Sequence, residues 1–409
     1  MPHERQRLLL SLLEKRLNHF PVVGVLGARQ TGKSTLLRDL LSQRRTLHYV
    51  TLDREEVLTQ AKKQPTAFLQ NLEDKKFKTV CIDEVQKAPV LFDTIKAEVD
   101  ENKRPGRFAL SGSTEFSKAV GIRESLTGRI ALTRLYPLNL AEIIGTEPSA
   151  RLLDATAKTW STAAKPQLSS TSRSRAPLIS LKDITLWTKR GGMPGIFAIR
   201  DDDARVAQYE SWIETTCSRD MSNFKISRFS ADLARRILKA VATCEISNRG
   251  EIASIVGKDP RSIEPYLQAF KSLFVLYEIE PHRTGVGKPT FFLFDSGMAN
   301  YLGASSQHCL SVWFLNECLS QHSYAGKPKP DIFYYKTTRG SIIDFVIENQ
   351  VGTYGCKLSE EEAPSTYQLR AVEAFSKKHP SIQVAVLCPC TNTLKLNRHS
   401  TLMPWTAIT

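Results

Sequence analysis

Residues 27–35 read Gly27-Ala28-Arg29-Gln30-Thr31-Gly32-Lys33-Ser34-Thr35. An apolar run at 21–26 precedes them, and a helical pattern begins directly after them with two leucines. A strand, a glycine loop and a helix in this order match the phosphate-binding pattern G-x-x-x-x-G-K-[S/T]. The glycines let backbone N–H groups turn toward one anion, and the helix N-terminus adds its dipole. The sequence therefore predicts a site for a purine nucleoside triphosphate, and it does not distinguish ATP from GTP.

Two side chains of this loop have distinct predicted roles. Lys33 is expected to reach the β- and γ-phosphates, and Ser34 is expected to ligate Mg²⁺. The nine residues predicted to bind the nucleotide are Gly27, Ala28, Arg29, Gln30, Thr31, Gly32, Lys33, Ser34 and Thr35.

An acidic pair follows about fifty residues later. Residues 78–84 form an apolar strand pattern that ends in Asp83 and Glu84. At the carboxyl edge of a parallel sheet, Asp83 would hold Mg²⁺ through water, and Glu84 would orient or deprotonate the attacking water. The acidic pair and the glycine loop together favour a hydrolytic site over a solvated turn.

Two further segments supply candidate catalytic residues. The strand pattern at 108–110 runs into a polar turn, where the hydroxyl of Ser113 or Thr114 would sense the γ-phosphate or position water. A turn that caps the next helix explains the same residues equally well. Arg129 follows a glycine directly before a new strand pattern, so it is a candidate to face phosphate charge, within the chain or across a subunit boundary. An ordinary surface charge is the alternative for Arg129.

Strand and helix patterns alternate from residue 47 to residue 113. Such alternation predicts right-handed βαβ units and a parallel sheet covered on both faces. The expected fold class is α/β, a doubly wound P-loop sheet with the nucleotide at the carboxyl ends of its strands.

The first 140 residues or so resemble a family of bacterial and archaeal AAA-type ATPases. The resemblance is carried by residues 27–37, by Ile82-Asp-Glu-Val-Gln-Lys-Ala-Pro89, by residues 110–113, and by residues 124–129 with the Leu-Tyr-Pro-Leu that follows. It implies ATP and Mg²⁺ as cofactors and the roles given above for the loop and the acidic pair. It also implies a C-terminal region with a winged-helix-like part and a restriction-endonuclease-like part.

These patterns divide the chain into four expected units. Residues 1–145 would form the AAA-type P-loop ATPase domain, and residues 146–180 a basic, serine-rich linker or lid. Residues 181–304 would form a helical and winged-helix-like segment, and residues 305–409 a small restriction-endonuclease-like α/β domain.

The segment at 248–274 has helix-turn-helix spacing, with a turn at Gly257. DNA reading by the second helix needs basic residues at its start, and only Lys258 and Arg261 stand there, with Glu264 nearby. A structural or subunit-contacting role remains open beside DNA binding.

The last unit carries an incomplete nuclease pattern. Asp344 and Lys357 fit the spacing of a restriction-type site, but Gly355 stands where the second metal-binding acid belongs. Because glycine offers no ligand, we expect this site to lack nuclease activity.

Composition sets the remaining expectations. The net charge of +14 favours contact with a polyanion without requiring it. The eight cysteines are scattered without a C-x-x-C pair, which is typical of a reducing cytoplasm. No apolar run approaches the ~20 residues of a membrane span, and the charged N-terminus predicts an amphipathic helix rather than a signal peptide.

Two functions therefore remain open. The first is an AAA-type ATPase whose Mg²⁺-dependent hydrolysis drives C-terminal domains that contact DNA or a protein partner, with a homo-oligomer giving Arg129 a neighbouring site to serve. The second is a nucleotide-gated DNA- or protein-binding module with negligible turnover.

Overall fold

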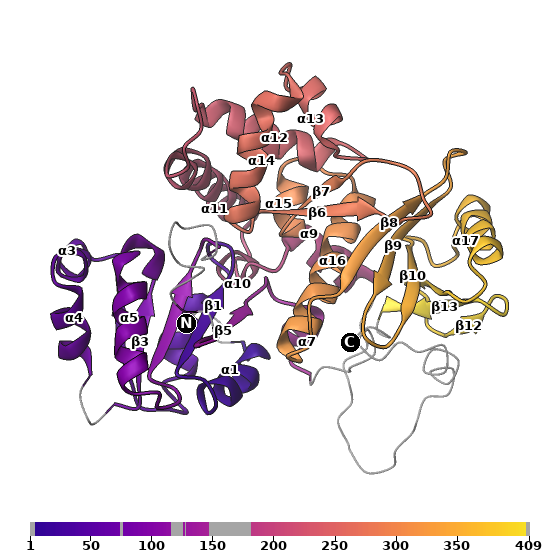
Figure 1. The fold of residues 1–409 in the computed structure, drawn as a ribbon. Helices are drawn as coiled ribbons and strands as arrows, with labels where there is room; N and C mark the ends of the chain where they lie inside the picture. Colours follow the sequence, from indigo (N-terminus) through magenta and orange to yellow (C-terminus); the bar gives the residue numbers. More distant parts are fainter. Residues whose placement is uncertain (1–4, 74–76, 116–125, 127, 147–180, 406–409) are drawn as a thin grey trace, which may run out of the picture.

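The computed structural model describes residues 5–73, 77–115, 126, 128–146 and 181–405. The expected linker or lid at 146–180 lies outside them except for its first residue. Figure 1 shows three regions: an N-terminal α/β domain, a group of helices from the middle of the chain, and a C-terminal mixed sheet with its helices.

The N-terminal domain contains a five-stranded sheet in the order β2-β3-β4-β1-β5, and every neighbouring pair is parallel. This confirms the predicted P-loop type of α/β fold. The strands are β1 (Val22–Leu26), β2 (Leu47–Thr51), β3 (Thr79–Asp83), β4 (Phe108–Gly112) and β5 (Ile130–Arg134).

The central strands of this sheet are continuous buried runs. All five residues of β1, of β3 and of β4 are buried, as expected for parallel strands with both faces covered. The helices of this domain are α1 (Leu9–Leu17), α2 (Lys33–Thr35), which continues as the π-helical turn η1 (Leu36–Leu40), α3 (Glu55–Lys63), α4 (Pro65–Leu72), η2 (Val85–Lys87), α5 (Val90–Glu101) and α7 (Leu140–Ile144). Helix α1 buries four leucines, so the predicted amphipathic helix is confirmed.

The middle region is helical. Its elements are α9 (Leu181–Arg190), α10 (Pro194–Phe197), α11 (Asp202–Glu214) with the π-helical extension η5 (Thr215–Asp220), α12 (Ala231–Thr243), α13 (Arg249–Ile255) and α14 (Pro260–Ser272). The predicted turn between α13 and α14 contains Gly257 at φ 65°, and the side chains of Asn248 and Asp259 cap the two helices. Two antiparallel strands follow, β6 (Leu276–Pro281) and β7 (Thr290–Leu293).

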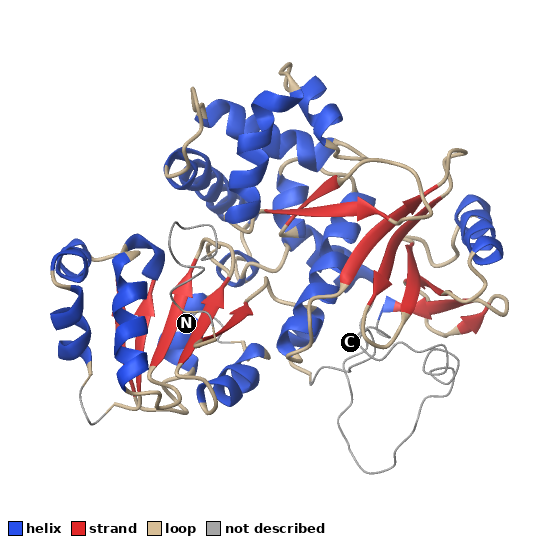
Figure 2. Ribbon diagram, viewed as in Figure 1, coloured by secondary structure: helices blue, strands red, loops and turns tan. Residues whose placement is uncertain are grey.

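The C-terminal region is built on an eight-stranded mixed sheet in the order β12-β13-β11-β10-β9-β8-β6-β7 (Figure 2). Strands β6 and β7, which lie in the expected winged-helix-like segment, thus belong to the same sheet as the strands after residue 305, and the domain boundary at 304 stays a prediction. The remaining elements are α15 (Ser296–Tyr301), α16 (Ser306–Tyr324), β8 (Asp331–Lys336), β9 (Ile342–Glu348), β10 (Thr353–Leu358), α17 (Thr366–Lys378), β11 (Gln383–Cys388), β12 (Leu394–Lys395) and β13 (Ser400–Pro404).

The N-terminal domain and the C-terminal region share one buried core. One cluster of buried apolar side chains extends from Leu9 to Trp405, and α16 contacts both α1 and β5. No helix in the described part of the chain is long and apolar enough to cross a bilayer.

Candidate nucleotide site

The loop after β1 requires glycine at two positions. A Cβ on Gly27 would lie 2.3 Å from the carbonyl oxygen of Leu135, and Gly32 has φ 93°, in the left-handed region. Gln30 also adopts a left-handed backbone, at φ 63°, which is uncommon for a residue with a side chain. The loop therefore keeps a conformation that packing against Leu135 and local backbone strain both restrict.

Lys33 lies within the loop and is 4% exposed. Its Nζ donates hydrogen bonds to the carbonyl oxygens of Gly27, at 3.0 Å, and Ala28, at 2.9 Å. Burial lowers the pKa of Lys33, although the charges of Glu84 and Asp83 act in the opposite direction. Loop and acidic pair are thus within electrostatic reach of one another.

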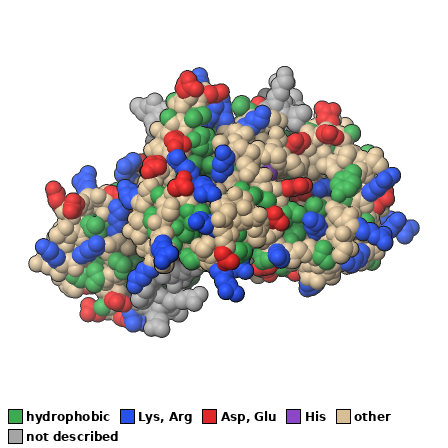
Figure 3. Space-filling model, turned by 90° about the horizontal axis from the view of Figure 1, so that it is seen from above, with side chains coloured by type: hydrophobic (Ala, Val, Ile, Leu, Met, Phe, Trp, Pro, Cys, Tyr) green, Lys and Arg blue, Asp and Glu red, His purple; other side chains and the backbone are tan. Residues whose placement is uncertain are grey.

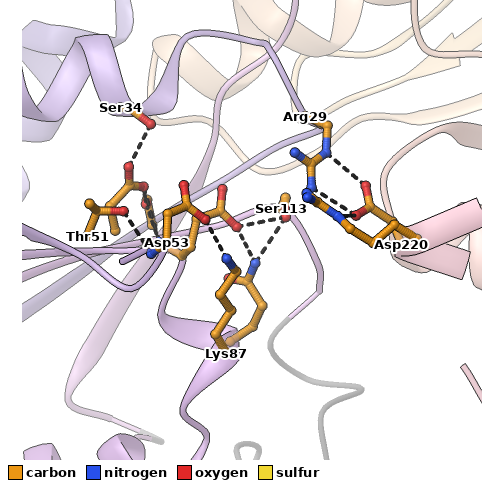
Figure 4. A network of polar contacts seen from close by, with 12 residues as sticks. Arg29, Ser34, Thr51, Asp53, Lys87, Ser113 and Asp220 are labelled. Carbon is orange, nitrogen blue, oxygen red and sulfur yellow. Dashed lines mark hydrogen bonds and ion pairs between the residues drawn. The ribbon is translucent and has the colours of Figure 1, made fainter. Parts of the chain in front are cut away.

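Asp83 is the centre of a hydroxyl cluster at the carboxyl end of β3. Ser34 donates to its Oδ2 at 2.6 Å, and Tyr49 of β2 donates to the same oxygen at 2.5 Å. Ser111 at the end of β4 donates to Oδ1. In Figure 4 a dashed line marks the hydrogen bond of the labelled Ser34. Burial and the bond to Asp83 raise the pKa of Tyr49, so this hydroxyl remains a donor.

Glu84 is held by a second cluster. Its backbone has φ 57°, and strained conformations of this kind gather at functional sites. Ser113 donates to Oε2 of Glu84 at 3.0 Å, and Gln86 donates to the same oxygen. The structure therefore brings Ser113 to Glu84, whereas Thr114, one residue farther on, is partly exposed.

The donor set fits a magnesium nucleotide. The Ser34 hydroxyl and Oδ2 of Asp83 lie 2.6 Å apart. Both are hard oxygen donors, the type of ligand that Mg²⁺ prefers.

The middle region contacts the loop directly. Asp220, the last residue of η5, forms two hydrogen bonds of 2.8 Å with the guanidinium of Arg29 (Figure 4). Trp212 of α11 donates from Nε1 to the carbonyl oxygen of Arg29 at 3.3 Å. A Cβ on Gly32 would meet Pro194 at 3.6 Å, so residues 191–194, Gly-Gly-Met-Pro, also lie beside the loop.

Arg7 supports the loop from the N-terminal segment. Its guanidinium donates to the carbonyl oxygens of Thr31 and Tyr136, both at 2.7 Å, and to the Tyr324 hydroxyl at 3.2 Å. Its charge is balanced by Glu142 at 3.0 Å, and both side chains are almost fully buried. The loop is thus connected to α7 and to α16.

Arg129 lies away from this site. It precedes β5 at the amino edge of the sheet, beside the first residue of β1, and pairs with Asp100 at 2.6 Å. The five-residue strand β1 places it about 16 Å from the start of the loop, beyond the length of an arginine side chain. Within one chain Arg129 does not reach the loop. If Arg129 contacts phosphate, as the sequence suggests, it must do so at the site of a neighbouring subunit.

The nuclease-like residues Asp344 and Lys357 form an ion pair. Lys357 contacts Asp344 at 3.1 Å, and the backbone N–H of Leu358 donates to the same carboxylate at 2.7 Å. A Cβ on Gly355 would meet Val384 at 3.3 Å and Phe375 at 3.4 Å. Among the described residues there is no group of three His, Cys, Asp or Glu side chains able to hold a metal.

Sequence reasoning missed several residues of the site. Tyr49 and Ser111 contact Asp83 because neighbouring parallel strands end at one edge, a relationship that needs the strand order. Arg7 and Asp220 come from distant segments of the chain, and no local pattern marks Arg7. Gln86 stands in the Gln-Lys-Ala-Pro segment of the family resemblance, which was its one signal.

Comparisons with known proteins agree with this geometry. A family model described as an AAA domain matches residues 19–144, and a model described as a domain of unknown function (DUF8612) matches residues 181–308. Uncharacterized proteins of Mycobacterium bovis and Mycobacterium tuberculosis are each 24% identical over 368 residues, covering 86% of this chain and 73% of their own length.

Solved structures give weaker similarities. A Walker-type ATPase of Pyrococcus abyssi has a TM-score of 0.43 at 17% identity, covering 72% of this chain and 94% of its own. A signal-transduction ATPase with numerous domains from Pyrococcus horikoshii has a TM-score of 0.27 at 11% identity, covering 77% of this chain and 46% of its own. Scores this low support no functional argument, whereas the strand order, the loop and the family match agree. Residues 19–144 are therefore similar to AAA domains in sequence, and their sheet has the strand order and loop of a P-loop fold.

Proposed function

We propose that this chain is a Mg²⁺-dependent ATPase that couples its nucleotide state to the C-terminal regions. The observation that carries the proposal is the meeting of Ser34 and Asp83 at 2.6 Å, with Glu84 directly beside them. A hydroxyl and a carboxylate from two separate segments converge where a metal-bound phosphate would lie.

Each residue has a specific role in this proposal. The backbone of residues 27–35 and the Lys33 ammonium bind the phosphates, and Ser34 and Asp83 hold Mg²⁺, which neutralises phosphate charge when bound. Glu84 accepts a proton from the attacking water or orients it. Ser113 fixes the Glu84 carboxylate through its 3.0 Å hydrogen bond and would act as the phosphate sensor.

Phosphate release by the full chain tests this function. Glu84→Gln should lower turnover on the order of 10²–10⁴-fold, the usual contribution of a general base, while nucleotide binding persists. Lys33→Ala supplies the background, because it removes the phosphate-binding ammonium. Wild-type release no faster than that of Lys33→Ala, with or without DNA, would refute the ATPase.

A nucleotide-gated module with negligible turnover is the second candidate. The contact of Arg29 with Asp220 favours it, since it joins the loop to the middle region whether or not hydrolysis occurs. Nucleotide-dependent binding of a partner by a chain that releases no phosphate would select this candidate.

DNA contact is a separate part of the proposal. On the face seen in Figure 3, lysine and arginine side chains are interspersed with acidic ones rather than gathered in one basic stripe. At the start of α14, Asp259 caps the helix and the side chain of Glu264 pairs with Arg249. These features favour a protein partner, and salt-dependent binding of duplex or single-stranded DNA would favour nucleic acid instead.

We also propose that the Asp344 site has no nuclease activity. Lys357 and the Leu358 N–H already engage the carboxylate, and position 355 faces apolar side chains. Metal-dependent cleavage of DNA by the purified chain, lost in Asp344→Ala, would overturn this part.

A further inference from the structure

Arg29 of the nucleotide loop is bound by a carboxylate of the middle region. Its Nε and Nη2 donate to the two oxygens of Asp220, each at 2.8 Å. The Arg29 side chain is 30% exposed and that of Asp220 is 13% exposed. Paired bonds of this geometry, partly shielded from water, are more specific than an exposed ion pair.

The main chain of Arg29 is bound by the same helical segment. Trp212 is 2% exposed, donates to the Arg29 carbonyl oxygen and stacks on Phe294 with ring centroids 5.3 Å apart. Because α11 continues into η5, Trp212 and Asp220 belong to one continuous helical segment, residues 202–220, which we call the α11–η5 rod. The rod therefore holds both the backbone and the side chain of Arg29.

Several charges converge on this arginine. Burial lowers the pKa of Arg29, but the hydrogen bonds and charge of Asp220 raise it above its ordinary value, and Glu84 and Asp53 act in the same direction. Lys33 experiences the charges of Glu84, Arg29 and Asp220 as well. The Arg29–Asp220 pair thus lies within electrostatic reach of the phosphate-binding lysine and of the proposed base.

A guanidinium binds phosphate with the same planar fork that it presents to a carboxylate. A triphosphate bound by residues 27–35 would bring several negative charges close to Arg29. The phosphate and Asp220 would then be two anions competing for one cation.

We propose that Asp220 competes with the triphosphate for Arg29, so that nucleotide binding draws Arg29 away and releases the α11–η5 rod from the loop. This inference rests on nucleotide binding in the proposed function and is independent of hydrolysis. It assigns to Asp220 a positioning role, because Asp220 acts through Arg29 rather than on the nucleotide.

Nucleotide affinity of the full chain tests the competition. The probe is a fluorescent, non-hydrolysable ATP analogue with Mg²⁺. Asp220→Asn removes the competing charge at nearly constant shape, so the dissociation constant should fall on the order of fivefold. Asp220→Glu keeps the charge and should remain near wild type. Asp203→Asn is the matched control, since it removes the same charge from an exposed position of α11.

Hydrogen exchange follows the release of the rod. In the wild type, the analogue should raise amide exchange in residues 202–220. In Asp220→Asn, exchange there should already be raised before the analogue is added. Arg29→Ala should weaken binding of the analogue. In the double variant Arg29→Ala/Asp220→Asn, the analogue should bind no more tightly than it does to Arg29→Ala.

The outcomes separate the two proposals. If Asp220→Asn melts like the wild type but binds the analogue no more tightly, the competition is refuted. The competition is also refuted if Asp220→Asn raises the affinity for the analogue just as much in a chain that carries Arg29→Ala. If the wild type shows no binding that depends on Lys33, both this inference and the proposed function fail. Binding that shifts as expected in a chain that releases no phosphate upholds the competition and rejects the ATPase.

Discussion

The Ser34 hydroxyl donates to Oδ2 of Asp83 across 2.6 Å, joining the first turn after the loop to the end of β3. Removing either partner should abolish the Mg²⁺ dependence of phosphate release, because Ser34 is the proposed ligand of the metal and Asp83 is proposed to hold it through water. Ser34→Ala and Asp83→Asn are therefore expected to lower release on the order of 10²-fold or more. A titration of release against Mg²⁺ measures this, with Ser42→Ala, exposed just beyond η1, as the control. Wild-type Mg²⁺ dependence in Ser34→Ala would exclude Ser34 as a ligand.

Tyr49 should tune the same site. Its hydroxyl orients the Asp83 carboxylate at 2.5 Å, and loss of such an outer partner commonly weakens metal binding about 10-fold or more. Tyr49→Phe is expected to raise the Mg²⁺ concentration for half-maximal release while the ATP concentration for half-maximal release changes little. Tyr367→Phe, at an exposed position of helix α17, is the control. An unchanged Mg²⁺ requirement in Tyr49→Phe would show that Asp83 needs no such partner.

Glu317 should make stability depend on pH. Burial in α16 raises the pKa of Glu317 from its ordinary 4.5 to about 8, against the opposing hydrogen bond from the Leu140 backbone N–H. Between those values the folded chain binds more protons than the unfolded chain. The free energy of unfolding must therefore fall as pH rises through this window.

Glu317→Gln removes this titration and keeps an oxygen that can accept the 2.6 Å bond from Leu140. The Tm of the wild type should drop between pH 5 and pH 9 by roughly several degrees more than the Tm of the variant. Melting curves of both proteins across that range measure the difference. Parallel curves would mean that Glu317 stays ionised when buried.

Gly355→Glu should destabilise the C-terminal sheet without creating a nuclease. The new side chain would point at Val384 and Phe375, where an added Cβ already has contacts of 3.3 and 3.4 Å. Burying a carboxylate there without a partner should lower stability by a few kcal/mol. Thermal melting and a DNA-cleavage assay with Mg²⁺ measure the two effects, with Gly355→Ala as the milder control. A stable variant that cleaves DNA would show that one acid was all the site lacked.

The sequence predicted the parts of the fold and site that local patterns encode. At the loop of residues 27–35 and at the buried strand before Asp83, an apolar strand pattern, its end and a reactive side chain all lie within a few residues. The sheet confirms their shared edge, because parallel strands place their carboxyl ends together.

Partners that come together through the tertiary fold could not be predicted. Tyr49 reaches Asp83 because β2 pairs with β3, and Asp220 meets Arg29 from 191 positions away along the chain. For Arg129 the sequence suggested a phosphate role, but the pairing of β5 with β1 sets it at the opposite edge. Strand order and register, rather than residue type, decide these contacts.

Buried hydrogen bonds between the N-terminal domain and α16 affect how the gene for this chain can evolve. Arg7 donates to Tyr324 of α16, while Glu317 of the same helix accepts the Leu140 N–H. An exchange of the gene's 3′ half for an unrelated sequence would leave the buried Leu140 N–H without its Glu317 acceptor and would remove one hydrogen bond of Arg7, and proteins seldom tolerate buried groups that lose their partners. The two halves are therefore expected to descend as one unit, with changes at position 7 matched by changes in α16.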